Sequence, residues 1–180
     1  MHISLNGKRA IVSGSTAGIG LAIATGLAEA GAEVVLNGRT QARVDQALKQ
    51  VRERVPAARI IGVVADLGTA EGARALFAQV PQTDILVNNL GIFEPKGFFE
   101  ISDDDWQRFF DVNVMSAVRL SRHYAPAMAE RNWGRVLFLS SESALEIPTE
   151  MVHYGTTKTA LLAISRGLAE TLAGTCLLYT

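Results

Sequence analysis

Short apolar runs alternate with longer segments of helical period along this chain. Five runs are apolar at nearly every position and predict strands: RAIVS, EVVLN, RIIGVV, DILVNN and RVLFLS, which begin at residues 9, 33, 59, 84 and 135. Strands without polar alternation are typical of sheets that are buried on both faces. The pattern therefore predicts an α/β fold with a doubly wound parallel sheet and right-handed crossover connections.

The segments between these runs repeat their apolar residues at intervals of three and four, as amphipathic helices do. The predicted helices cover residues 19–30, 44–55, 69–79, 102–130 and 151–173. The apolar face of the first consists of Ile19, Ile23, Leu27 and Ala30. Gly31 follows this helix and can supply a left-handed C-terminal cap. At the start of the fourth helix, Ser102 and Asp105 have the spacing of a capping box.

Composition and charge narrow the class of protein. The chain has 180 residues, of which 48% are hydrophobic and 19% charged, so it can bury the core of one globular domain. Its 17 basic and 18 acidic residues give a net charge of −1, which predicts neither a nucleic-acid nor a membrane-surface partner. No apolar run approaches the ~20 residues of a membrane span, and no signal-sequence core is visible, so we expect a cytoplasmic protein. The single cysteine, Cys176, excludes an internal disulfide and a cysteine-rich metal cluster.

Glycines gather in the turn between the first predicted strand and the first predicted helix. Gly14, Gly18 and Gly20 stand in the stretch IVSGSTAGIG. Small residues at such a turn let backbone N–H groups approach a pyrophosphate, and the positive end of the helix dipole favours its charge. A tight turn without a ligand is the alternative, but the position between strand and helix favours a dinucleotide site.

The end of the second predicted strand indicates which dinucleotide is bound. This position usually carries an acidic residue that holds the ribose 2′-hydroxyl and would repel a 2′-phosphate. Here the chain reads Asn37, Gly38, Arg39, Thr40. Because an arginine offers a fork of donors suited to phosphate, the sequence favours NADP(H) over NAD(H). A solvated arginine at the start of a helix is the alternative.

Several motifs occur together in an order and spacing that resemble one family. Gly14-x-x-x-Gly18-Ile19-Gly20 is followed by NNLG at residues 88–91, and Ser141 precedes the pair Tyr154-x-x-x-Lys158. Over residues 3–174 the chain thus resembles the short-chain dehydrogenase/reductase family. The resemblance implies a Rossmann fold and reversible hydride transfer between NADP(H) and a small carbonyl or secondary alcohol, by a homodimer or homotetramer. A member that binds nucleotide without catalysis is the alternative.

The catalytic residues are expected in the second half of the chain. Tyr154 and Lys158 share one face of a helix, and a nearby ammonium favours the phenolate form that makes a tyrosine useful near neutral pH. The resemblance makes Tyr154 the proton donor, Lys158 a partner of the nicotinamide ribose, Ser141 the group that holds the carbonyl and Asn113 a proton relay. Three alternatives remain open. Tyr154 and Lys158 would then be an interfacial tyrosine and an exposed lysine, Asn113 a hydrogen-bonded core amide, and Ser143 would act in place of Ser141.

The same resemblance predicts further contacts with the cofactor. They are Ser15, Ile19, Asp66, Asn88 and Gly91, with Asp66 on the adenine and residues 88–91 along the ribose. Leu90 departs from the alanine that is more usual in NNLG. Three phenylalanines in the following loop, Phe93, Phe98 and Phe99, are candidate substrate contacts. The histidines, His2, His123 and His153, have no second ligand at metal spacing and are interpreted as structural or surface residues.

The resemblance stops at about Gly174, so we expect one Rossmann domain over residues 1–174, incomplete because its last strands are lacking. Residues 175–180 then form an atypical tail. Without a sixth strand, the fifth strand would become an edge of the sheet with unpaired backbone groups, which is an aggregation hazard.

Overall fold

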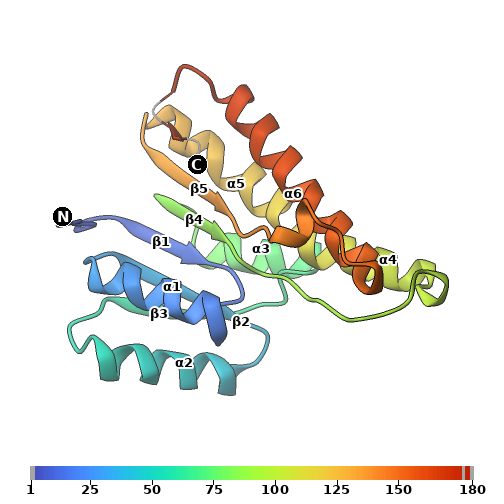
Figure 1. Cartoon of the computed structure of the whole chain (residues 1–180). Coiled ribbons are helices and arrows are strands. Elements are labelled where there is room, and N and C mark those ends of the chain that lie inside the picture. The colour runs from blue at the N-terminus through green and yellow to red at the C-terminus, as the bar shows by residue number, and fades with distance from the viewer. Residues whose placement is uncertain (1–2, 176, 179–180) are drawn as a thin grey trace.

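The computed structural model describes residues 3–175 and 177–178 and contains one parallel sheet (Figure 1). Its strands are β1 Arg9–Val12, β2 Glu33–Gly38, β3 Ile60–Val64, β4 Ile85–Asn88, β5 Gly134–Phe138 and β6 Leu177–Leu178. Their order across the sheet is β3-β2-β1-β4-β5-β6, and every pair is parallel. The chain reverses its direction of winding between β1 and β4. This confirms the doubly wound Rossmann-type fold and puts a ligand crevice at the carboxyl ends of these two strands.

Helices cover the sheet and connect its strands. The α-helices are α1 Gly18–Glu29, α2 Gln41–Arg54, α3 Ala70–Gln79, α4 Asp103–Phe109, α5 Ser116–Glu130 and α6 Val152–Thr171. Short 3₁₀ turns are η1 Phe98–Glu100, η3 Glu142–Ala144 and η4 Thr149–Met151. One apolar cluster packs α1 and α2 on the sheet, and another packs α3 and α5 on its other face. Within the described residues, no helix has the length and apolarity needed to cross a bilayer.

The expected burial of the strands on both faces holds only in the middle of the sheet. Every residue of β4 is buried, and so is every residue of β1 and β2 after the first. In β3, by contrast, Ile61 and Val64 are exposed, and in β5 Leu137 is exposed. An apolar run therefore identified each strand but did not show how far from the sheet centre the strand lies.

The single helix predicted over residues 102–130 is wrong in its middle. A π-helix, η2 Phe110–Met115, separates α4 from α5 and contains Asn113. Ser102 and Asp105 do form the predicted capping box at the start of α4. A π-turn inserts an extra residue per turn and changes the direction in which its side chains point, which is why such turns are common at functional sites. Apolar periodicity alone does not distinguish it from an α-turn.

The expectation that β5 would be an edge strand is wrong for its first residues. Leu177 pairs with Gly134 and Leu178 with Arg135, so the segment interpreted as a tail contains the short strand β6. Gly174 makes this possible because its φ of +88° turns the chain after α6, a conformation that favours glycine. Cys176 and residues 179–180 lie outside the described residues, as does His2.

The apolar repeat predicts the face that the first helix turns to the sheet only in part. Ile23 and Leu27 are partly buried and pack against the core, but Ile19 is 69% exposed. The fully buried residues include Gly20, Ala24 and Ala28. Small residues are buried here because α1 approaches the strands closely. Gly31 has a φ of +92°, which confirms the predicted left-handed end of the helix.

Candidate functional site

The glycine turn between β1 and α1 needs its glycines for two different reasons. Gly14 and Gly18 have φ values of +61° and +55°, in the left-handed region. A Cβ on Gly18 would meet no atom within 4 Å, so its backbone conformation, and not packing, favours glycine there. A Cβ on Gly20 would lie 2.4 Å from Asn89 Nδ2 and 2.7 Å from the Gly14 carbonyl oxygen. Gly20 is therefore required first by packing within the protein.

A buried asparagine that sequence reasoning did not single out organises this turn. Asn37 Oδ1 accepts a hydrogen bond from the Gly14 N–H at 3.1 Å. Its Nδ2 donates to the carbonyl oxygens of Val63 at 3.2 Å and Ala65 at 3.0 Å. One amide thus connects the glycine turn, β2 and the end of β3. A polar residue in the apolar run EVVLN was the available signal.

Two predicted cofactor residues direct their side chains into the protein. The Ser15 hydroxyl donates to the Val12 carbonyl oxygen at 2.7 Å and accepts from the Asn37 N–H at 2.9 Å. Asn88 Nδ2 donates to Ser121 Oγ at 3.1 Å. Both residues are buried. Contacts of Ser15 and Asn88 with a cofactor therefore remain predictions that would involve their backbone, and their side chains hold the loops in place.

A cleft of about 260 Å³ opens beside the glycine turn, at the carboxyl ends of the central strands. Its lining includes Gly14, Gly38, Arg39, Arg43, Asp66 and Gly91. Asp66 Oδ1 accepts from the Gly68 N–H at 3.0 Å, which fixes that carboxylate at the rim. No ion pair of Arg39 or Arg43 occurs in the described part of the chain, and both are exposed. Arg43, one helical turn after Arg39, is a second cation that sequence reasoning missed.

Lys158 lies where this cleft meets α6. Its side chain is 5% exposed, and Nζ donates to the Leu139 carbonyl oxygen at 2.7 Å. A Cβ on Gly91 would lie 3.4 Å from Nζ, so glycine at this position leaves one side of the ammonium free. Nζ is 5.7 Å from the centre of the Tyr154 ring. Burial lowers the pKa of Lys158, because a charged ammonium loses its hydration there.

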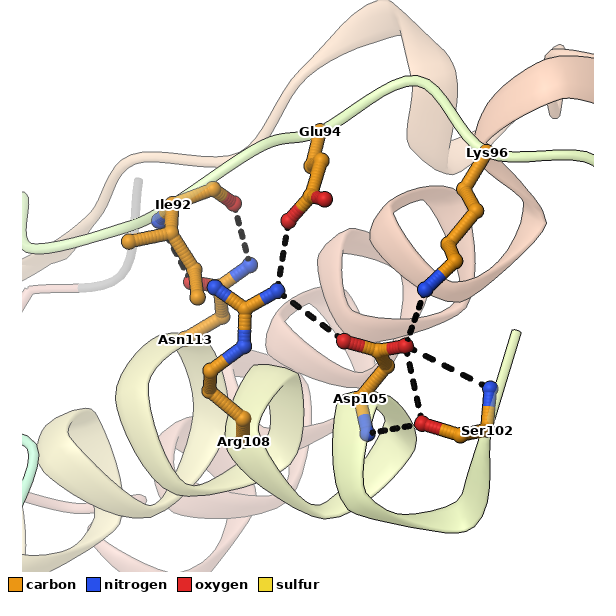
Figure 2. Close-up of polar contacts among 7 residues, drawn as sticks. All are labelled: Ile92, Glu94, Lys96, Ser102, Asp105, Arg108 and Asn113. Carbon is orange, nitrogen blue, oxygen red and sulfur yellow. Dashed lines mark hydrogen bonds and ion pairs between the residues drawn. The ribbon is translucent and has the colours of Figure 1, made fainter. Parts of the chain in front are cut away.

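Asn113 is a fully bonded buried amide. Oδ1 accepts from the Ile92 N–H at 2.7 Å, and Nδ2 donates to the Ile92 carbonyl oxygen at 2.9 Å (Figure 2). Nδ2 also donates to Thr157 Oγ1 at 3.0 Å. The residue has no exposed surface. These contacts match the alternative of a satisfied core amide, and they join the loop after β4 to α6; the proton relay remains a prediction.

Ser141 lies on a segment that packs against α6. The Ser140 hydroxyl donates to the Lys158 carbonyl oxygen at 3.0 Å. A Cβ on Gly155 would lie 2.8 Å from the Ser143 carbonyl oxygen, so only glycine next to Tyr154 admits this approach. Ser141 Oγ accepts from the Ser143 N–H at 3.2 Å, which leaves its hydroxyl able to donate to another group. The structure therefore brings Ser141 and Lys158 to neighbouring segments beside Tyr154.

A known family model matches most of this chain. The match covers residues 8–177, and the family is described as short chain dehydrogenase. The chain belongs to this family. The glycine turn, the buried lysine and the tyrosine on α6 all fall within the matched region, so the family predicted from the sequence is confirmed.

Relatives and solved structures agree with this membership. The chain is 51% identical to the uncharacterized oxidoreductase YvaG of Bacillus subtilis, over 97% of this chain and 66% of that protein. It is 33% identical to the 3-oxoacyl-[acyl-carrier-protein] reductase FabG of Aquifex aeolicus, over 96% of this chain and 71% of the reductase. The structure resembles L-sorbose reductase of Gluconobacter frateurii in complex with NADPH and L-sorbose, with a TM-score of 0.91, 34% identity, and coverage of 98% and 68%. The chain spans about two thirds of the length of YvaG.

An ion network holds the loop after β4 on α4, next to the site shared with the family (Figure 2). Lys96 Nζ lies 2.5 Å from Asp105 Oδ2, and Arg108 bridges Asp105 at 3.2 Å and Glu94 at 2.5 Å. Ser102 also donates its hydroxyl to Asp105. The bond from Lys96 is the main reason why the pKa of Asp105 is lowered, and the same contact raises the pKa of Lys96. The network thus favours the ionised form of Asp105.

His153 precedes Tyr154 and is completely buried. Its ring centre lies 4.0 Å from that of Phe109 and 6.0 Å from that of Trp106. Neither ring nitrogen has a hydrogen-bond partner among the described residues. Burial lowers the pKa of His153 and keeps it neutral. This agrees with the structural interpretation of the histidine, and no group of three metal-ligating side chains occurs in the described part of the chain.

Proposed function

We propose that this protein transfers a hydride reversibly between NADP(H) and a carbonyl or secondary alcohol, as a 3-oxoacyl reductase or a ketone reductase does. The observation that carries the proposal is the position of Lys158, whose buried ammonium lies beside Gly91 in the cleft and beside the ring of Tyr154. A lysine is rarely buried without a specific role, because the loss of hydration is costly. Here it can serve the cofactor and the tyrosine together.

The cleft fits a dinucleotide phosphate. Gly14, Thr16 and Ala17 line the cleft just before the start of α1, where a helix N-terminus favours a pyrophosphate. Arg39 and Arg43 offer two cations in the same cleft, near the end of β2. We therefore propose that NADPH binds more tightly than NADH and that Arg39 is responsible. The NADPH complex of the similar L-sorbose reductase supports this choice.

Fluorescence titration of both reduced nucleotides tests the cofactor assignment. Arg39→Ala should remove the preference for NADPH and leave the affinity for NADH nearly unchanged. Arg52→Ala, a matched change in the last turn of α2, should keep the preference. Equal affinities of the parent protein for NADPH and NADH would contradict the assignment.

In the proposed reaction the nicotinamide supplies the hydride, and the residues of this chain supply binding and the proton. The Tyr154 hydroxyl gives its proton to the carbonyl oxygen as the alcohol forms. The Ser141 hydroxyl donates a hydrogen bond to the same oxygen and orients it. Lys158 favours the phenolate left on Tyr154 and holds the nicotinamide ribose. Asn113, which bonds Ile92 and Thr157 on the two sides of this centre, would position the groups through which the proton is replaced from solvent.

Removing one hydroxyl tests the proton donor. Tyr154→Phe should lower the turnover number by at least ~10²-fold, the usual effect of losing a general acid, while the Kd for NADPH stays the same. Tyr124→Phe provides the control, because Tyr124 is buried in the core and donates to the Val80 carbonyl oxygen. Turnover by the Tyr154 variant within a few-fold of the parent would refute the role.

Assembly and location are proposed from the family alone. We propose a homodimer or homotetramer in the cytoplasm, built from one Rossmann domain over residues 1–174. Light scattering coupled to size-exclusion chromatography measures the number of subunits directly. A purely monomeric protein at micromolar concentration would contradict the assembly and would leave the catalytic proposal in place.

A further inference from the structure

The loop between β4 and η1 has two chemically different sides. Residues 92–96 alternate along the chain, and the side chains of Glu94 and Lys96 point toward α4, where they pair with Arg108 and Asp105 (Figure 2). Phe93 directly precedes Glu94 in the sequence. Its ring lies 6.3 Å from the ring of Tyr154, on α6. The charged groups are thus engaged on one side of the loop, and an aromatic ring faces the other.

Phe93 is exposed to solvent although its side chain is apolar. Its side chain is 71% exposed, and the two rings are inclined at 66°, an edge-to-face arrangement. Asn113 fixes the backbone of the preceding residue, Ile92, through two hydrogen bonds. The residues before and after Phe93 are therefore both fixed: Asn113 bonds Ile92, and Arg108 pairs with Glu94. This holds the Phe93 ring at Tyr154.

A second exposed apolar side chain, in the segment after η3, lies beside the residue that follows Tyr154. A Cβ on Gly155 would lie 2.7 Å from Ile147 Cγ2, so Ile147 packs against the backbone of Gly155. Ile147 is 44% exposed. The backbone N–H of Lys96 donates to the Glu150 carbonyl oxygen at 2.6 Å, which joins the two segments. Phe93 thus lies at Tyr154 and Ile147 at the next residue of α6, on segments that are hydrogen-bonded to each other.

We propose that the substrate of this protein is a carbonyl compound with an aryl or branched alkyl group next to the carbonyl, and that Phe93 and Ile147 bind this group. The proposal rests on the function proposed above and names its substrate class. Exposed apolar surface favours an apolar ligand because both surfaces leave water. A polyhydroxylated ketone would need hydrogen-bond donors and acceptors where Phe93 and Ile147 lie. The charged side chains of the same loop, Glu94 and Lys96, are already paired with residues of α4.

Direct binding measurements on the full chain test this proposal. The probes are propiophenone, an aryl alkyl ketone, and L-sorbose, a polyhydroxylated ketone, each titrated by calorimetry into the protein saturated with NADP⁺. We expect propiophenone to bind at least about tenfold more tightly than L-sorbose. Phe93→Ala should weaken propiophenone binding about tenfold, and Phe93→Leu should restore most of it.

The control variant separates this site from general surface hydrophobicity. Ile61→Ala removes an apolar side chain that is 42% exposed on β3, at the opposite edge of the sheet, and it should leave both affinities unchanged. The substrate class is wrong if L-sorbose binds more tightly, or if the Phe93 and Ile61 variants lose equal affinity, while NADP⁺ still binds; the proposed function is then retained. Failure to bind either NADP⁺ or NADPH, by a chain whose circular dichroism shows the native fold, overturns both proposals.

Discussion

Two buried asparagines organise the two halves of the site, and their surroundings differ. Asn37 bonds the glycine turn to the end of β3, and all its partners are backbone groups or the Ser15 hydroxyl. Asn113 bonds the loop after β4 to α6, and it lies close to titratable groups, with its Oδ1 only 3.5 Å from the Cβ position of Gly91 that also faces Lys158. The hydrogen bonds of Asn37 in the nucleotide half join neutral groups. In the catalytic half, the hydrogen bonds of Asn113 lie close to charged side chains.

This difference separates what each half contributes. A backbone held by neutral amides keeps its shape when pH or salt changes, which suits the recognition of a cofactor common to many enzymes. The catalytic half contains a buried lysine, a buried histidine and an ion network. Changes of protonation should therefore act on the catalytic half, and the nucleotide half should respond mainly to loss of a hydrogen bond or to steric conflict.

The largest expected effect comes from removing the two amides. Asn37→Ala leaves the Gly14 N–H and the carbonyl oxygens of Val63 and Ala65 without this partner, and should lower the free energy of unfolding by about 3 kcal/mol. Asn113→Ala should cost a similar amount for the same reason. Urea denaturation measures both.

Ligand binding then distinguishes the two variants. Asn37→Ala should weaken NADPH binding more than Asn113→Ala does, because Asn37 bonds the glycine turn directly. Asn113→Ala should act on ketone binding, since its partner Ile92 precedes Phe93. Identical binding defects in both variants would show that the two halves are not separable in this way.

Alanine at two glycines of α1 should change the free energy of unfolding in opposite directions, by about 2 kcal/mol at Gly20 and about 0.5–1 kcal/mol at Gly26. Gly20→Ala puts a Cβ 2.7 Å from the Gly14 carbonyl oxygen, and overpacking of this kind costs about 2 kcal/mol. A Cβ on Gly26 meets nothing within 4 Å, so Gly26→Ala should stabilise the helix by about 0.5–1 kcal/mol. Thermal unfolding of the two variants measures the signs. A stabilising Gly20→Ala would mean that the turn yields easily.

Local sequence spacing places the residues of the nucleotide half in the fold, whereas the arrangement of the catalytic half depends on tertiary packing; the cofactor and catalytic roles of these residues remain predictions. Gly14, Gly18 and Arg39 belong to a strand, turn and helix that are consecutive in the chain, so spacing alone placed them. Gly20 was predicted as a cofactor contact. The structure adds a packing reason, because a Cβ at this position would collide with Asn89, which lies about 70 residues away in the sequence. A local sequence pattern cannot reveal such a contact.

The parts that could not be predicted all depend on tertiary packing. Nothing in the apolar periodicity of residues 102–130 distinguishes the π-turn around Asn113 from a regular helix. His153 looked like one of three scattered histidines, and its burial against Phe109 requires α4 and α6 to meet. The strand at Leu177 and Leu178 is short, and β5 gives it a partner only after Gly174 turns the chain.

A smaller effect is expected from pH, and it should be confined to the catalytic half. The pKa of His153 lies below its usual value of 6.5 in the folded protein. Above pH 6.5 the histidine is neutral in both states, so stability is complete. As the pH falls below 6.5, the unfolded chain gains a proton that the folded protein does not, and stability decreases until the lower folded pKa is reached.

The charged groups that face His153 do not cause this decrease of stability with falling pH. Asp105 and Glu94 favour its protonated form, and Arg108 and Lys96 oppose it. The pKa of Asp105 is lowered, so its contribution is lost only as the pH falls below its usual range near 4, outside the window of the histidine.

Unfolding temperatures between pH 8 and pH 5 measure this effect. His153→Leu should flatten the decrease below pH 6.5. His123→Leu should not, because His123 is exposed and stacks on Phe77 at 3.8 Å. An unchanged slope in the His153 variant would assign the acid sensitivity to another group.

The smallest effect is expected from the ion network itself. Lys96→Gln removes the pair with Asp105, yet the unfolding temperature should change by about 2 °C or less, because Asp105 keeps its contacts with Arg108 and the Ser102 hydroxyl and the Lys96 side chain is partly exposed. Lys49→Gln, which removes a pair with Glu53 on α2, should change it equally little. The two variants should differ in ketone affinity, since only Lys96 helps to hold the loop that carries Phe93. A weaker affinity for propiophenone in the Lys96 variant at constant unfolding temperature would show that the network acts by positioning this loop, and equal affinities in both variants would show that Asn113 alone is sufficient.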